Sequence, residues 1–288
     1  MTARDLLETP ELLTKSASDF YAQHFTNMMT FSLSEMAMRA HRRFLTSTAK
    51  VLGGDANEPH EVFPDQFRQL DLYGEFLSET RPARQEMTLS RSVDNFLSYI
   101  SDILTQAIVT RPHLLKTREQ VTLEEVLTHA SLEDFVRWAA ERRVNQLSFK
   151  GLKEIADYVE SRLGLKLHTS DDDWATLNKA VAVRNIVVHR RAIIDERFLW
   201  SVKEPGLKLG QKYQVSQTDM AESMKCTMRM VRDFDARIAD KFGLALLNAS
   251  DQTWYEERAH SATAYEKEVV AQDDRSLAPQ DDDQSSPS

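Results

Sequence analysis

The candidate catalytic residues of this sequence lie in one segment, VAVRNIVVHRRAIIDERFL, residues 181–199. On a helix with about 100° per residue, Arg184 falls within an apolar stripe beside Val181 and Val188, and His189 lies about 140° away from it. A guanidinium in such a stripe is costly unless it faces a partner, a cleft or an anion. Taken alone the pattern is weak, because a solvated arginine and a histidine that ends a helix would also explain it.

Other sequence motifs for catalysis or metal binding are absent from the chain. There is no phosphate-binding loop, no His-Glu-x-x-His helix, no Cys-x-x-Cys pair and no Gly-x-Ser-x-Gly turn. The single cysteine, Cys226, excludes disulfides within the chain and Cys-rich metal sites. We therefore expect no metal and no cofactor, and Cys226 itself is expected to be an inert, buried thiol.

The composition favours a helical protein. Hydrophobic residues make up 41% and charged residues 28% of the chain, and only 8 of its 288 residues are glycine, whereas folds with many tight turns need more. The N-terminus has no signal-peptide pattern and no apolar stretch is long enough to span a bilayer, so we expect a cytoplasmic protein without a membrane partner.

The formal net charge of −9 is unevenly distributed. From Asp251 to the end, ten acidic residues face three basic ones, so this segment carries −7 and the rest of the chain about −2. The net charge therefore excludes neither RNA nor protein as a partner.

The chain divides into four regions by pattern. Residues 1–54 form an N-terminal helical region with one long helix or two shorter ones over residues 11–52, and residues 55–90, which contain three prolines, form a connector with a short helix. Residues 91–247 carry the strongest helical periodicity and are predicted to form a helical bundle. Residues 248–288 form an acidic tail that we expect to be disordered from about residue 271.

Helix starts within the predicted bundle can be located from capping residues. Thr122 and Glu125 form a capping-box pattern, and Ser131 precedes another periodic segment. Three aspartates at 171–173 suit the first turn of the helix that leads into the motif. Residues 207–215 are predicted to be extended, and a stripe of methionines from Met220 marks the buried face of a last long helix.

The region from about residue 91 to 245 resembles the HEPN superfamily, in particular its RiboL-PSP-like branch. The resemblance rests on the order of the segments FLSYISDILTQAIVTRP, VTLEEVL, SLEDFVRWAAERRVNQLSFKGLKEIADYVESRLGL, RNIVVHRRAIID and LKLGQKYQVS, followed by a long helix. The hallmark of the family is an arginine, a polar residue, and a histidine four to six residues after the arginine. Arg184, Asn185 and His189 match this hallmark one for one.

The resemblance implies an all-α, HEPN-like bundle that forms a homodimer and brings two Arg–His pairs into one cleft. In active members this cleft is a metal-independent endoribonuclease site, acting in RNA turnover, stress response or defence. His189 would accept the 2′-hydroxyl proton or protonate the leaving 5′-oxygen, and Arg184 would hold the scissile phosphate. Asn185 would orient His189 or the phosphate through its amide. The products would be a 2′,3′-cyclic phosphate and a 5′-hydroxyl end.

The residues after the histidine depart from the family pattern. Many relatives have Asn or Gly there, whereas Arg190 and Arg191 follow in this chain. With Arg197 they are candidate RNA-binding residues at the rim of the site, although solvated charges at a helix end are an equal interpretation. The acidic tail could lie over this rim and mimic RNA, or it could simply keep the protein soluble.

Two other interpretations of the motif stay open. The chain could be a non-catalytic HEPN dimer that binds RNA or a protein partner such as an antitoxin. Alternatively, the protein could be purely structural and the motif a coincidence.

Overall fold

The computed structural model describes residues 9–54, 76, 78–115 and 120–252. The predicted all-α bundle is confirmed, because helices dominate the described residues and the sheet found among them is one antiparallel pair of two-residue strands. The longer helices are α2 (Lys15–Val51), α4 (Arg81–Thr110), α6 (Leu132–Lys150), α8 (Asp171–Arg190) and α10 (Gln217–Phe242). The shorter elements are α5 (Leu123–Leu127), α7 (Leu152–Tyr158), α9 (Glu196–Val202), the 3-10 turns Pro112–Leu115 and Ala249–Asp251, the π-helical turn Val159–Leu163, β1 (Leu12–Leu13) and β2 (Leu247–Asn248).

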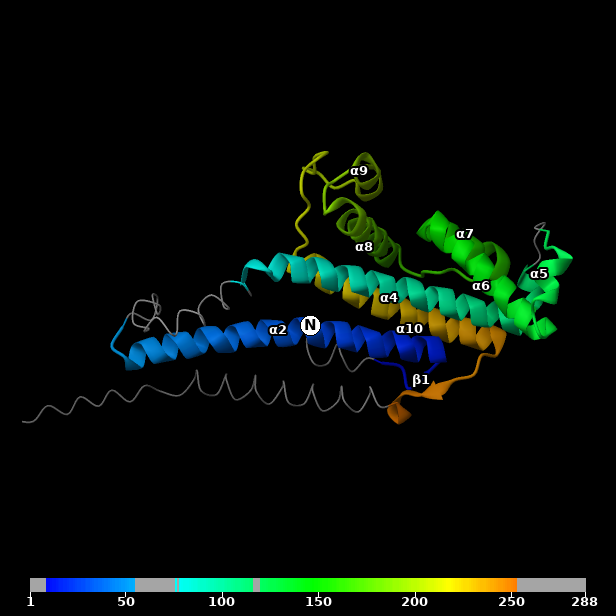
Figure 1. The fold of residues 1–288 in the computed structure, drawn as a ribbon, viewed down its shortest axis with the longest axis horizontal. Helices are drawn as coiled ribbons and strands as arrows, with labels where there is room; N and C mark the ends of the chain where they lie inside the picture. The colour runs from blue at the N-terminus through cyan, green and yellow to red at the C-terminus, as the bar shows by residue number, and fades with distance from the viewer. Residues whose placement is uncertain (1–8, 55–75, 77, 116–119, 253–288) are drawn as a thin grey trace, which may run out of the picture.

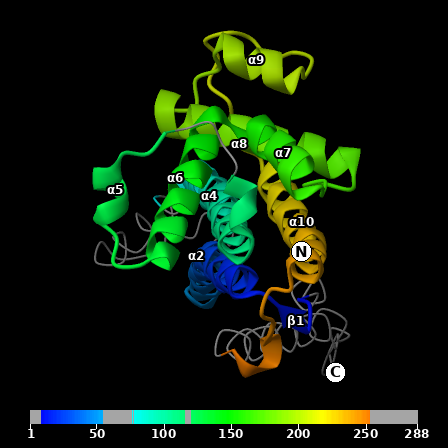
Figure 2. The same ribbon diagram turned by 90° about the vertical axis from the view of Figure 1, so that its right-hand side faces the viewer.

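The helices form layers on either side of α4. Figures 1 and 2 show α2, α4 and α10 running side by side, with α6 and α8 packed across α4 and with α9 beyond α8, on the side away from α2. No helix in the described ranges is long and apolar enough to cross a membrane.

Helix starts agree with the capping residues predicted from the sequence. Thr122 and Glu125 form a reciprocal capping box at α5, in which the Thr122 backbone N–H donates to the Glu125 carboxylate at 2.8 Å. The hydroxyl of Ser131 accepts from the Asp134 backbone N–H at 3.1 Å and starts α6. These local bonds satisfy backbone donors that have no partner inside the helix, so they can be identified without knowledge of the tertiary structure.

The predicted connector ends earlier than residue 90. Helix α4 begins at Arg81, and Pro82 lies in its first turn, where proline's missing N–H costs nothing. Residues 81–90 therefore belong to α4, the helix against which α2, α6, α8 and α10 all pack. The remainder of the predicted connector up to residue 75 lies outside the described residues, as does the tail from residue 253 on.

The N-terminal helix α2 packs against α4. Phe20 and Tyr21 of α2 are buried in the same core as Phe96 and Tyr99 of α4. The start of the predicted tail is also anchored, because Leu247 and Asn248 pair with β1. Helix α2 is thus a structural layer of the domain.

A second buried cluster packs against the inner face of α8, the helix that carries the motif. It joins side chains from α2, α4, α8, α9, the loop before α10, and α10 itself. Its members are Met28, Phe31, Leu89, Val93, Ala180, Val183, Ile186, Ile194, Phe198, Tyr213, Val215, Met220 and Met224. The methionine stripe of the last helix is accordingly core, as predicted.

Candidate functional site at the end of helix α8

Helix α8 carries the motif in its last two turns. The Ser170 hydroxyl accepts from the Asp173 backbone N–H at 3.2 Å and caps the helix, and the three aspartates occupy the first turn. The acidic side chains in the first turn complement the helix dipole, and so do His189 and Arg190 in the last turn. The sequence of α8 thus defines both ends of the helix that carries the motif.

The buried face of α8 differs from the predicted stripe. Leu177, Ala180, Val183 and Ile186 are buried, whereas Val188 is 50% exposed. A spacing of three rotates the buried stripe by about 60° per step, so at the end of the helix Val188 points about 160° away from Ile186. The expectation that Val188 is buried was therefore wrong, and an apolar side chain lies exposed beside the motif.

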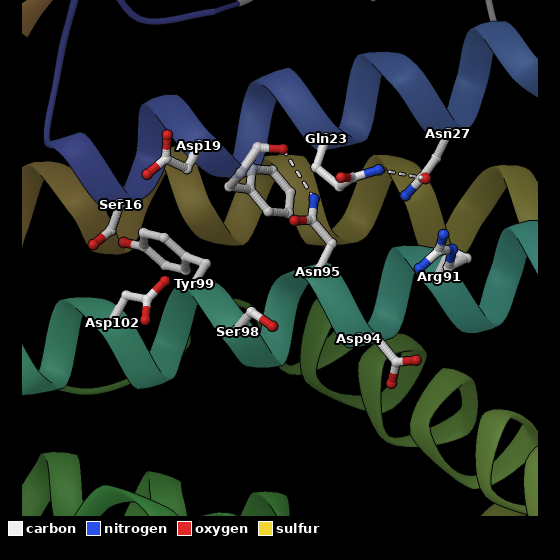
Figure 3. Close-up of a pocket in the computed structure, with 11 residues that line it drawn as sticks. Ser16, Asp19, Gln23, Asn27, Arg91, Asp94, Asn95, Ser98, Tyr99 and Asp102 are labelled. Atoms are coloured by element: carbon white, nitrogen blue, oxygen red, sulfur yellow. Dashed lines mark hydrogen bonds between the residues drawn. The ribbon is translucent and has the colours of Figure 1, made fainter. Parts of the chain in front are cut away.

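Arg184 has the partner that its position requires. Its Nε donates to Asp94 Oδ1 of α4 at 2.8 Å, and its Nη1 donates to the amide oxygen of Asn185 at 3.2 Å. The Arg184 side chain is 24% exposed and that of Asp94 43%. Figure 3 shows Asp94 on α4, turned away from α2. The guanidinium is therefore held in a fixed orientation, and one edge of it, at Nη2, has no bond within the described chain.

His189 stands apart from Arg184 within one chain. Its side chain is exposed on the last turn of α8 and has no hydrogen-bond partner among the described residues. The imidazole is free to meet a ligand or a second molecule. Within one chain no hydrogen bond joins Arg184 to His189, so chemistry that uses both needs a bound ligand or a second copy to complete the site.

The turn after the motif is formed without glycine. Arg191 and Ala192 both have positive φ, 53° and 62°. This conformation costs residues other than glycine roughly 1–2 kcal/mol each. Ala192 is fully buried, its N–H donates to the Ile186 carbonyl at 2.9 Å, and its carbonyl accepts from the Tyr213 N–H at 2.8 Å. Burial of Ala192 and these two backbone hydrogen bonds therefore hold the turn.

The predicted extended segment lies against this turn. Ile193 and Lys212 form an isolated antiparallel bridge, and Ile194 exchanges backbone hydrogen bonds with Gly210 and Gln211, each of 2.9 Å. The segment thus brings its lysines to the end of α8, which sequence reasoning did not anticipate.

The three predicted RNA-binding arginines are all exposed at this end of the molecule. Arg190 lies 3.6 Å from Asp195, the residue that caps α9, whereas Arg191 and Arg197 form no ion pair within the described residues. Sequence reasoning missed Asp94, whose role depends on packing between α4 and α8. It also missed Trp200, which follows Arg197 by three residues on α9 and is 80% exposed.

A polar groove lies between α4 and α2, on the side of α4 that faces away from α8 (Figure 3). Asp19 of α2 and Asp102 of α4 face it, and partial burial together with the charge of Asp19 raises the pKa of Asp102. Among the described residues, no group of three or more His, Cys, Asp or Glu side chains could hold a metal ion. Asp94 also lines this groove, so it lies between the groove and Arg184.

The arrangement at the end of α8 can bind an anion and transfer a proton. The Arg184 guanidinium is oriented by two acceptors and retains a donor edge, which suits a phosphate oxygen. An exposed imidazole can act as an acid or a base towards a bound ligand.

Comparison with known proteins does not assign this geometry to a family. No family model matches the chain, and neither the curated proteins nor the solved structures contain a significant match to it. The resemblance to HEPN proteins stays a prediction from the motif and the order of the helices.

Proposed function

We propose that this protein is a metal-independent endoribonuclease of the HEPN type that acts as a homodimer. The observation that carries the proposal is the motif itself at the end of α8. There Arg184 is oriented by Asp94 and Asn185, and His189 is exposed one turn further on. Its cellular role would be RNA turnover, a stress response or defence.

The proposed reaction needs no group beyond these side chains and the RNA. One His189 accepts the proton of the 2′-hydroxyl, whose oxygen attacks the adjacent phosphorus and displaces the 5′-oxygen. The His189 of the second copy donates a proton to that leaving oxygen. Arg184 binds the non-bridging oxygens and stabilises the charge that develops on them. The products are a 2′,3′-cyclic phosphate and a 5′-hydroxyl.

A second copy supplies what one chain lacks. Arg184 and His189 of one chain point in different directions on α8, so a two-fold axis near the end of this helix would join the Arg of one copy with the His of the other. Val188 lies between them in the sequence and is half exposed. An apolar side chain in that place suits a face that a second copy covers.

A second candidate function is a non-catalytic dimer that binds RNA or a protein partner. It is favoured by one observation: the charge of Arg184 is already balanced by Asp94 at 2.8 Å. A phosphate would have to compete with that carboxylate for the guanidinium. In this alternative the motif serves assembly and orientation, and no bond is broken.

The test is cleavage of a labelled RNA pool by the purified full-length protein in EDTA. We expect wild type to cut and His189→Ala to lose activity by at least about 100-fold, the contribution of general acid–base catalysis. Arg184→Ala should also lose at least about 100-fold, the contribution of a charge-stabilising donor. The matched control is His113→Ala, which removes an exposed histidine remote from α8 and should cut like wild type. If wild type binds RNA and leaves it intact, the non-catalytic function replaces the proposal.

A further inference from the structure

The surface around α9 combines exposed cations with one exposed tryptophan. We name it the α9 surface and define it by its members, which are Arg190, Arg191, Arg197, Trp200, Lys203, Lys208 and Lys212. Residues 190–212 contain six basic and three acidic residues, a net charge of +3, in a chain whose formal net charge is −9. The α9 surface is thus a local positive region on an acidic protein.

The orientation of Trp200 follows from how α9 is anchored. Phe198 is buried against Tyr213, with ring centroids 5.4 Å apart, and Asp195 caps the helix through the Phe198 N–H at 2.8 Å. Trp200 is two residues further on, about 200° around the helix, and is therefore directed away from the core. Its 80% exposure is large for the side chain with the greatest apolar area.

Arg197 shares the outer face of α9 with Trp200. Residues three apart on a helix are neighbours, with about 5–6 Å between their Cβ atoms. Arg197 is exposed and forms no ion pair within the described chain. A planar aromatic face and a guanidinium therefore lie side by side, both open to solvent.

The lysines are brought to the same surface by the loop after α9. The backbone pairing of residues 192–194 with 210–213 places Lys212 opposite Ile193, close to the end of α8. Lys203, Lys208 and Lys212 are exposed and unpaired among the described residues, whereas Glu204 of the same loop is bound to Lys179 at 3.0 Å. The loop therefore adds three exposed cations, whereas its one acidic residue is held in an ion pair with Lys179, which also binds Asp219 at 3.0 Å.

These features fit a nucleic acid better than a protein interface. Lysine is depleted in the cores of protein–protein interfaces, where unpaired charges are costly, whereas phosphates attract several cations at once. Aromatic faces next to cations are the recurrent means by which proteins hold unpaired bases. In a duplex the bases are stacked on each other and cannot cover Trp200.

We infer that the α9 surface binds single-stranded RNA, with one base stacked on the Trp200 indole and the flanking phosphates on Arg197 and the loop lysines. This inference rests on the proposed function and deepens it, because it names unpaired RNA as the substrate that enters the site at Arg184 and His189. Trp200 is a binding residue in this account and takes no part in bond cleavage.

The test measures binding separately from cleavage. The probe is a fluorescein-labelled oligomer of about 12 nucleotides of 2′-O-methyl uridine, which cannot be cut by 2′-hydroxyl attack, titrated by anisotropy at about 50 mM salt. We expect Trp200→Ala to weaken binding about 5- to 100-fold and Trp200→Tyr to restore most of it. The matched control is Phe149→Ala, which removes a 93% exposed aromatic ring on α6 and should leave affinity unchanged.

Two further readouts complete the test. Replacing Lys208 and Lys212 by alanine should lower the slope of log K against log salt by about 1.4, since each phosphate contact on a single strand contributes about 0.7. Sedimentation velocity of Trp200→Ala should show the same oligomeric state as wild type.

The outcomes separate this inference from the proposed function. The inference is overturned, even if the protein cuts RNA, if Trp200→Ala binds the labelled oligonucleotide as tightly as wild type does. It is also overturned if Trp200→Ala loses affinity equally for the single-stranded probe and for a duplex probe. Loss of the wild-type oligomeric state in Trp200→Ala also overturns it and assigns Trp200 to an interface between copies. Trp200-dependent binding in a protein that never cuts RNA supports the inference and removes the proposed nuclease activity.

Discussion

Removal of the Asp94 carboxylate should uncouple Arg184 from the body of the protein. The two side chains are joined by one bond of 2.8 Å and are about one quarter and two fifths exposed. At an effective dielectric constant of about 20, two charges about 4 Å apart attract by about 4 kcal/mol. Desolvation and side-chain ordering cancel most of this, which leaves a net value of about 1 kcal/mol for a partly exposed, charge-assisted pair.

The same change should separate RNA binding from catalysis. Without Asp94 the guanidinium gains freedom and the site loses a negative charge that repels phosphate. KM should therefore fall, because RNA binds more tightly. The kcat should also fall, by about 10-fold, which corresponds to about 1.4 kcal/mol added to the activation free energy from the enzyme–RNA complex. A merely structural role for Asp94 would lower the amount of folded protein and leave both constants of the folded fraction unchanged.

The assay combines urea unfolding and RNA cleavage of Asp94→Ala, Arg184→Ala and the double variant. The expected coupling free energy in the double-mutant cycle is about 1 kcal/mol. Asp102→Asn is the control, because it also removes a negative charge from α4 but lies eight residues, or about 12 Å, along the helix. A coupling energy near zero, or equal effects of the Asp94 and Asp102 variants on kcat, would refute the reasoning.

Two other variants and one chemical-reactivity measurement probe the described structure. The pKa of Asp102 is raised by burial and by Asp19, so its ionisation costs stability as pH rises through that pKa. Asp102→Asn should raise Tm at pH 7 and increase the free energy of unfolding there by less than about 1 kcal/mol. It should have no effect near pH 3, where the carboxyl is protonated in both the folded and the unfolded state. Asp235→Ala should cost about 2 kcal/mol or more in urea unfolding, because it leaves the buried N–H and hydroxyl of Thr14 without their acceptor. Cys226, whose pKa burial raises to about 12, should react with a thiol reagent at pH 8 only after unfolding, and rapid reaction of the native protein would contradict its burial.

Local signals in the sequence predicted much of the helical framework. The capping residues Thr122 and Ser131 located helix starts because their hydrogen bonds are made within four residues. The methionine stripe from Met220 predicted the buried face of α10 because that face is straight and keeps one periodicity. The need of Arg184 for a partner was also predictable, since a guanidinium on an apolar stripe is costly.

The identity of that partner was not predictable, because it depends on packing. Asp94 lies 90 residues before Arg184 and meets it only because α4 and α8 cross. The exposure of Val188 follows from the rotation of the buried stripe around α8, and the start of α4 at Arg81 was obscured by Pro82. The roles of Trp200 and the loop lysines required the backbone pairing that folds residues 210–213 against the end of α8.

In the proposed reaction, the 2′-hydroxyl of the RNA attacks its own phosphate at the end of α8. The most direct measurement compares a cleaved RNA oligonucleotide with the same oligonucleotide carrying a single 2′-deoxyribose immediately 5′ of the scissile phosphate, in EDTA. We expect the RNA to yield a 2′,3′-cyclic phosphate and a 5′-hydroxyl, and the deoxy-substituted strand to stay intact at that position. Equal cleavage of both strands, or products with a 5′-phosphate, would contradict the proposed reaction.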